Sequence, residues 1–99
     1  MKEIIEKINK VFENKVRLGI MSVLSVNESV DFKELKSLLD ITDGNLSSNA
    51  SVLESEGYIK VKKKFIGKKT QTLYYSTDKG RSAFKEHLSA LENLIRNLS

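Results

Sequence analysis

The sequence predicts a mainly α-helical domain that carries one small β-hairpin. Three observations lead to this fold class. Apolar residues recur at steps of three and four over most of the 99-residue chain, which is the period of amphipathic helices. From Ile59 the period changes to two, as expected for a strand. A glycine, Gly67, lies where that strand would turn back on itself.

Two helices are predicted in the first 26 residues. Asn14 is expected to cap the second of them, over residues 14–26, because an Asn side chain accepts backbone N–H groups at a helix start. The inward face of this second helix comprises Val16, Ile20, Val23 and Leu24. One apolar stripe predicts that residues 1–13 form a single first helix, and its members are Ile4, Ile5, Ile8, Val11 and Phe12.

Two shorter helices follow. Asp31 with Glu34 three residues later is a capping box, and it predicts the start of a third helix. The buried stripe of that helix is Phe32, Leu35, Leu38 and Leu39. Thr42 is expected to cap a fourth helix, whose inward stripe is Leu46, Ala50, Leu53 and Gly57. The outward face of the fourth helix is then mostly small and polar: Asn45, Ser47, Ser48, Ser51, Val52 and Ser55.

A hairpin follows the fourth helix. Gly57 is expected to end that helix, and residues 58–77 then form two strands joined by a turn at 66–69. Three helices followed by a hairpin are the winged helix-turn-helix arrangement, with the helix-turn-helix at 31–57 and the wing at 58–77. The length of the chain suits one domain, residues 1–99.

The last helix, over residues 78–98, carries an apolar seam at steps of four and three. Such a stripe can fold back on its own core or pair with a second chain. Pairing is favoured, because the isoleucines of the first helix already exceed what a three-helix core absorbs. Segments 1–13 and 78–98 are therefore predicted to form a homodimer through Ile4, Ile5, Ile8, Phe84, Leu88, Leu91, Ile95 and Leu98.

Positive charge is concentrated in the wing. Six of the eleven residues from Ile59 to Lys69 are lysine, so a chain of net charge +4 keeps −2 on its other 88 residues. Lysines also protect sheet edges from unwanted pairing, but one or two would suffice for that. The cluster therefore predicts contact with phosphates of double-stranded DNA. The predicted backbone contacts are Asn49, Arg17, Lys33, Lys36, Lys62, Lys64, Lys68 and Lys69, while plain surface charge is an equal alternative for Arg17, Lys33 and Lys36. Lys63 is expected to lie partly buried beside Phe65.

The fourth helix is the predicted reader of base edges. It has no Lys or Arg, and its short Asn and Ser side chains can donate and accept hydrogen bonds in a major groove. The alternative is that these side chains only solvate an exposed helix, although Ser is a mediocre helix former there. The predicted base contacts are Asn45, Ser47, Ser48 and Ser51.

A family resemblance covers about residues 12–95. It is carried by 17–21, Phe32 and Leu35, by the runs 42–48 and 53–59, and by Lys63, Phe65, Gly67, Lys68, Tyr74, Thr77, Gly80 and Arg81. On these residues the chain resembles a small winged-helix transcriptional regulator of the MarR/ArsR-like group. Asn49 stands where such proteins usually carry His, and Thr70-Gln71 where Pro-Arg is common. The target DNA sequence therefore cannot be inferred from relatives.

The composition argues against several other functions. Cysteine is absent, and the single histidine, His87, cannot form a metal site alone. No phosphate-binding glycine loop or facing carboxylate pair occurs, so no enzyme and no cofactor is expected. His87 is expected at the surface or at an interface rim. No apolar run approaches the roughly 20 residues of a membrane span, and a cytoplasmic location is expected.

The favoured function is a dimeric DNA-binding regulator, most simply a repressor. The alternative is a winged-helix protein-interaction module without specific DNA reading. Whether a small molecule acts as effector is left open by the sequence.

Overall fold

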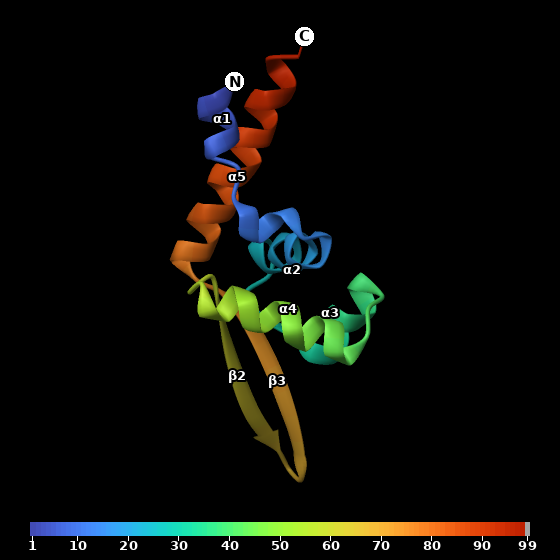
Figure 1. The fold of residues 1–99 in the computed structure, drawn as a ribbon. Helices are drawn as coiled ribbons and strands as arrows, with labels where there is room; N and C mark the ends of the chain where they lie inside the picture. The colour runs from blue at the N-terminus through green and yellow to red at the C-terminus, as the bar shows by residue number, and fades with distance from the viewer. Residues whose placement is uncertain (99) are drawn as a thin grey trace.

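The computed structural model describes residues 1–98 of the chain. The elements follow the predicted order of helices and hairpin (Figure 1). They are α1 (Lys2–Glu6), a 3-10 helix η1 (Lys10–Glu13), α2 (Lys15–Ser25), β1 (Val30–Asp31), α3 (Phe32–Leu39), α4 (Asp43–Ser55), β2 (Ile59–Ile66), β3 (Lys69–Ser76) and α5 (Asp78–Arg96). A winged helix-turn-helix fold, mainly helical with a small antiparallel sheet, is thus confirmed.

Polar side chains cap the starts of the four longer helices. Asn14, Asp31 and Thr42 accept backbone N–H groups at the starts of α2, α3 and α4, as predicted. Thr77 does the same for α5 by accepting the N–H of Gly80. Each such cap stabilises its helix by about 1 kcal/mol. Sequence-local hydrogen bonds therefore set where these helices begin.

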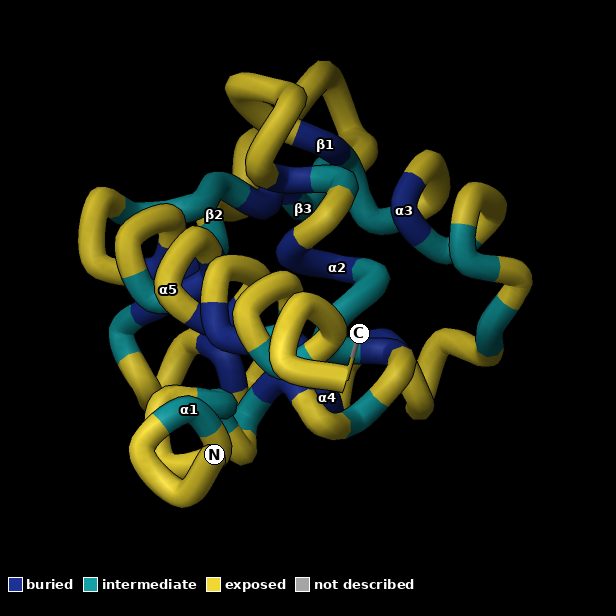
Figure 2. Tube along the Cα trace, turned by 90° about the horizontal axis from the view of Figure 1, so that it is seen from above, coloured by how far each residue is buried: buried dark blue, intermediate teal, exposed yellow. Residues whose placement is uncertain are grey.

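The core lies around α2. Ile20, Met21 and Leu24 are fully buried, and α2 packs against α3, α4, β3 and α5. Leu35 of α3 and Leu46 and Leu53 of α4 close the same core. Figure 2 shows buried segments of α2, β1 and β3 near the centre, with much of α1 exposed at the periphery. Burial of each leucine or isoleucine side chain stabilises the fold by about 1.5 to 3 kcal/mol. Because this energy holds the apolar sides of α3 and α4 against the core, their opposite sides face outward.

The first helix differs from its prediction. The chain forms two short helices, α1 and η1, that are broken at Asn9. The Asn9 side chain accepts the N–H of Val11 at 2.9 Å and donates to the Tyr58 hydroxyl at 2.9 Å. Its backbone N–H donates to Nδ1 of His87 at 3.0 Å. These bonds stabilise a break that the apolar period alone does not indicate.

The sheet has one strand more than predicted, in the order β1-β3-β2. The short β1 pairs antiparallel with β3, with Val30 opposite Tyr74. The wing is the β2–β3 hairpin, in which Ile59 pairs with Ser76 and Ile66 with Lys69. Gly67 begins its two-residue turn with a φ of 65°, a left-handed conformation that glycine adopts without strain.

Two apolar positions were assigned to the wrong side of their helices. Leu38 was expected in the buried stripe of the third helix, but its side chain is 62% exposed. In α5 the inward face consists of Gly80, Phe84, His87 and Ala90. Phe84 packs edge-on against Phe12, with ring centroids 5.3 Å apart, so it belongs to the core of the chain itself. Its predicted place in the intermolecular seam is therefore wrong, because its apolar surface is already covered.

Among residues 1–98, no helix has the length and apolar character to cross a membrane.

Candidate nucleic-acid interface

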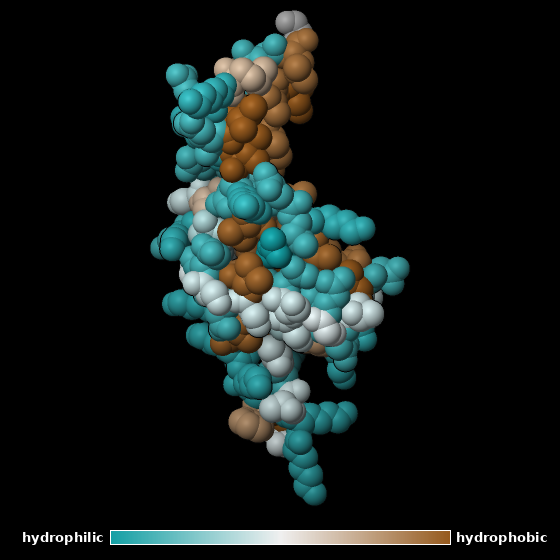
Figure 3. All heavy atoms as spheres, viewed as in Figure 1, coloured by the Kyte–Doolittle hydropathy of each residue, from teal (hydrophilic) through white to brown (hydrophobic). Residues whose placement is uncertain are grey.

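The outward face of α4 has the surface expected of a base reader. Asn45, Ser47, Ser48 and Ser51 are all exposed, because Leu46, Ala50 and Leu53 hold the opposite face in the core. Figure 3 shows a pale, nearly neutral band across the part of the molecule where α4 lies in Figure 1. Short side chains permit a close approach, and their hydroxyl and amide groups can donate to and accept from base edges.

Asn49 lies on the other side of α4, and its predicted contact with phosphate is wrong. It is buried, with 8% of its surface exposed. Its Oδ1 accepts a hydrogen bond from Nη1 of Arg17 at 2.9 Å. Its Nδ2 donates to the Oδ1 of Asn45 at 2.7 Å and to the backbone oxygen of Asn45 at 3.0 Å. Both amide atoms of Asn49 are therefore engaged inside the protein.

Arg17 is likewise held inside the chain. Its Nε donates to the backbone oxygen of Val11 at 2.7 Å, in addition to the bond from Nη1 to Asn49. The guanidinium therefore connects η1, α2 and α4. The predicted phosphate contact of Arg17 stays a prediction, and the observed bonds assign the residue a structural role as well.

The wing carries its lysines on exposed surface away from the core. Lys60, Lys62 and Lys64 alternate along β2, and Lys68 and Lys69 lie at the turn. The Lys62 Nζ lies 5.2 Å from the centroid of the Tyr75 ring, which orients this cation. In Figure 1 the hairpin projects from beneath α4 away from the helical body. The cationic groups are therefore placed where a second macromolecule can reach them.

The wing tip also exposes an aromatic ring. Phe65 is 80% exposed and Ile66 is 62% exposed. Lys63 is exposed as well, so the expectation that it lies partly buried beside Phe65 is wrong. The hairpin extends beyond the helices at this point, and nothing from the core reaches its end. Among the signals in the sequence, only the length of the hairpin could have indicated that Lys63 and Phe65 are exposed.

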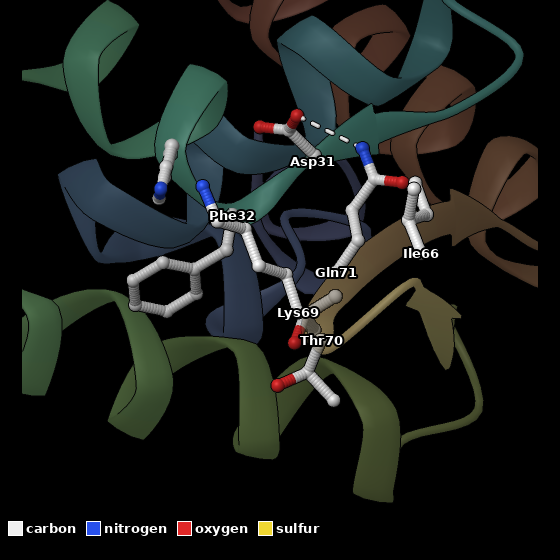
Figure 4. Close-up of a pocket in the computed structure, with 8 residues that line it drawn as sticks. Asp31, Phe32, Ile66, Lys69, Thr70 and Gln71 are labelled. Atoms are coloured by element: carbon white, nitrogen blue, oxygen red, sulfur yellow. Dashed lines mark hydrogen bonds between the residues drawn. The ribbon is translucent and has the colours of Figure 1, made fainter.

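A groove of about 340 Å³ separates the start of α3 from the wing tip (Figure 4). Phe32 and Lys33 line it from α3, and Lys69 and Gln71 line it from β3. The Gln71 Nε2 donates to the Asp31 Oδ2 at 3.2 Å across the upper end of the groove. The structure thus brings Lys33 near the wing. Lys36 lies elsewhere, 2.7 Å from Asp43 in a solvent-exposed ion pair that contributes at most about 1 kcal/mol.

Apolar side chains remain uncovered at the other end of the molecule. Ile5, Leu88, Ile95 and Leu98 are exposed, from 45% at Leu88 to 76% at Leu98. Ile4, Ile8 and Leu91 are partly buried, because α1 packs alongside α5. Figure 3 shows a hydrophobic surface along the upper part of α5. Apart from Phe84, the residues of the predicted seam are therefore exposed or half-exposed, and their pairing with a second chain stays a prediction.

His87 is buried at the junction of α5 with η1, so its predicted surface position is wrong. It is 3% exposed, its ring lies 5.4 Å from that of Phe12, and its Nδ1 accepts the N–H of Asn9. Burial lowers the pKa of His87 below 6.5, and the negative charge of Glu13 acts in the opposite direction. His87 is therefore a neutral core acceptor near pH 7. Burial, with a smaller effect of Glu54, raises the pKa of Tyr74.

The bonds from Arg17 through Asn49 to Asn45 were not recognised in the sequence. The i, i+4 spacing of Asn45 and Asn49 in a helix was an available signal, because side chains at that spacing meet. Within residues 1–98 no group of three or more His, Cys, Asp or Glu side chains could hold a metal ion.

Comparison with known proteins agrees with this architecture. The profile of a family described as winged helix DNA-binding domain matches residues 16–95. A solved structure of a transcriptional regulator homologue from Pyrococcus horikoshii OT3 is 36% identical, with a TM-score of 0.90, over 100% of this chain and 99% of that one. An uncharacterized protein of Methanocaldococcus jannaschii is 36% identical over 90% of this chain and 97% of its own length.

A third comparison is with a solved structure of lower sequence identity. The Bacillus subtilis PadR structure, solved in complex with operator DNA, is 17% identical with a TM-score of 0.67. It covers 76% of this chain and 48% of that one, and at this identity it shows a shared fold alone. The family profile spans most of the chain and includes both α4 and the wing. This chain therefore belongs to the winged helix DNA-binding domain family and is a DNA-binding transcriptional regulator.

Proposed function

We propose that this protein is a homodimeric, sequence-specific regulator that reads base edges with α4 and holds DNA phosphates with the wing. One observation carries the proposal. A helix with a neutral, hydrogen-bonding outward face is followed directly by a hairpin that concentrates six lysines. These are the two different surfaces that base reading and phosphate binding require.

The α4 helix is the element that enters the major groove. A B-DNA major groove about 12 Å wide admits an α-helix, and residues near the helix start are the usual base contacts. Asn45, Ser47 and Ser48 lie in the first half of α4 and are exposed. Ser51 lies one turn further along the same face.

The wing supplies most of the electrostatic attraction. Lys68 and Lys69 at the tip are proposed to lie over the minor groove, with Lys62 and Lys64 along the backbone. Lys33 is a further candidate, because Lys33 and Lys69 line the same groove. A phosphate backbone also relieves the mutual repulsion of these closely spaced cations.

A second copy of the chain is the proposed partner of the exposed α5 surface. Leu88, Leu91, Ile95 and Leu98 follow at steps of three and four, which is the spacing of a helix-pairing seam. A twofold dimer would place two α4 helices in successive major grooves, about 34 Å apart. The expected target is an imperfect palindrome, and occlusion of a promoter would make the protein a repressor. Its site of action would be the cytoplasm, with the DNA.

Selection of bound duplexes from a random library tests this proposal. The expected result is one enriched sequence with a twofold repeat, bound with an affinity that falls steeply as salt rises. A winged-helix module that binds only protein would enrich no sequence, and any residual DNA affinity would not depend on which duplex is offered. That result would overturn the proposed function.

Ser48→Ala tests the reading of bases by α4. Loss of one hydroxyl contact is expected to weaken binding to the selected duplex by about 1 kcal/mol, and to leave binding to unrelated duplexes unchanged. Ser89→Ala is the matched control, because Ser89 is an exposed serine on α5. An equal loss on all duplexes would mean that Ser48 contacts the DNA backbone.

A further inference from the structure

Arg17, Asn49 and Asn45 form a chain of hydrogen bonds whose direction is set at one end. A guanidinium carries hydrogen-bond donors only. The atom of Asn49 that faces Arg17 Nη1 at 2.9 Å must therefore be its carbonyl oxygen. The chemistry of the partner thus determines which way the Asn49 amide points.

The orientation of the Asn49 amide in turn determines which atom of the Asn45 side chain faces it. With its oxygen toward Arg17, Asn49 presents its NH₂ group to α4, 2.7 Å from the Asn45 side chain. The facing atom of Asn45 must accept, so it is Oδ1. A second bond from the same NH₂ group to the backbone oxygen of Asn45 holds Asn49 in place. Asn49 is 8% exposed, so little water competes for these bonds.

The consequence appears on the outward face of α4. Asn45 is exposed, and its Nδ2 makes no hydrogen bond within the part of the chain that the structure describes. Thr42 fixes the backbone of Asn45 by accepting its N–H at 3.1 Å. Asn45 is therefore held with its oxygen on the protein side and its donor group directed away from Asn49.

We propose that Arg17 and Asn49 are specificity-determining positioning residues, which make Asn45 a donor toward DNA. This inference rests on the proposed function of α4. A donor at this position fits purine N7, guanine O6 or thymine O4, and it disfavours the N4 amino group of cytosine. A bidentate pairing of Asn45 with adenine is disfavoured too, because it needs Oδ1 and Nδ2 to face the DNA together, whereas Oδ1 is turned toward Asn49.

Asn49→Asp is the sharpest test, because it reverses the donor and acceptor roles in the hydrogen bond between residues 49 and 45. The carboxylate has acceptors only, so it still accepts from Arg17 and keeps that cation paired. It loses the bond to the Asn45 backbone oxygen, and it can hold the Asn45 side chain only if Asn45 turns its NH₂ group inward and its oxygen toward the DNA. The base preferred at the Asn45 position should then move to one that donates, cytosine N4 or adenine N6, with a change in relative binding of about fivefold or more.

Arg17→Met is the second variant, and it removes the donor that sets the direction together with the backbone oxygen of Asn45. Only the bond to that backbone oxygen then orients the Asn49 amide, so the base preference at the Asn45 position should weaken toward that of Asn45→Ala. The slope of log K against log salt should stay unchanged. Arg17 acting as a phosphate contact would instead reduce that slope by about 0.9 and leave the base preference intact, which would overturn the inference.

Selection from a random duplex library, carried out on the parent chain and both variants, provides the measurement. A parent that selects a sequence, together with an Asn49→Asp variant that selects the same base at every position, would overturn the inference and leave the proposed function standing. A parent that selects no sequence would refute the proposed function itself. Unfolding curves of both variants show whether each folds, and either variant alone is enough to support or overturn the inference.

Discussion

Replacing both lysines at the wing tip tests the electrostatic part of the proposed function. Lys68 and Lys69 are exposed at the turn of the hairpin, and neither belongs to the hydrophobic core. Their replacement by alanine should therefore leave the core and the outward face of α4 intact. Each phosphate that the variant no longer neutralises should reduce the slope of log K against log salt by about 0.9, so the pair should reduce it by about 1.8.

The size of the effect follows from that slope. Between about 50 and 200 mM salt the concentration rises fourfold, so a slope difference of about 1.8 changes the ratio of the two affinities by about twelvefold. The parent should bind far better than the Lys68→Ala, Lys69→Ala variant at low salt, and this advantage should shrink as salt rises. Fluorescence anisotropy with one labelled duplex over a salt series measures both slopes.

A control variant with the same loss of net charge distinguishes a contact between the wing tip and DNA from a general effect of lower positive charge. Lys2→Ala with Lys7→Ala also lowers the net charge by two, and both lysines are exposed near α1. Figure 1 places α1 at the opposite end of the molecule from the wing, and the longest dimension of the molecule is 55 Å. The salt slope of this control should match that of the parent. Equal slopes in the parent and the wing variant would show that the wing tip does not contact DNA.

Three further predictions concern assembly and stability. Ile95→Glu should give a monomer of unchanged fold, since Ile95 is 67% exposed, and a parent-like mass in sedimentation would refute the seam. Burial holds the pKa of His87 below its ordinary 6.5, so its share of stability is complete above pH 6.5 and is lost as pH falls through the folded-state pKa. Urea unfolding should show that loss in the parent and not in His87→Gln, and identical pH profiles would contradict it. Gly80→Ala should destabilise by about 3 kcal/mol or more, because its Cβ would lie 2.0 Å from the Tyr58 backbone oxygen, whereas Gly44→Ala meets nothing within 4 Å and should stabilise α4 by up to about 1 kcal/mol. Similar melting temperatures for both glycine variants would contradict this packing.

Much of the fold and of the candidate site was predictable, because local interactions decide it. The caps at Asn14, Asp31 and Thr42 each join a side chain to a backbone N–H two or three residues away. The inward stripe of α4 follows from helical spacing, and it fixes the exposed serines on the opposite face. The lysines of the wing alternate with apolar residues at the start of β2, so the same pattern predicts both the strand and its charge.

Other features depend on partners that are distant in the sequence. Asn9 breaks the first helix because it meets His87, 78 residues away, and Tyr58, 49 residues away. In α5 two apolar stripes lie side by side, and periodicity does not say which one the core takes. Contact with η1 selects Phe84 and His87, which leaves Leu88 and Ile95 outside.

The amino-acid sequence by itself determined the element order, the helix starts, the neutral face of α4 and the cationic wing. These depend on residue type and on spacing within a few positions of the chain. Only the tertiary structure decided that Arg17 reaches Asn49 across 32 residues and thereby orients Asn45. The physical reason is that the direction of an amide is set by the donor that it meets in space, and no pattern of neighbours along the chain specifies that meeting.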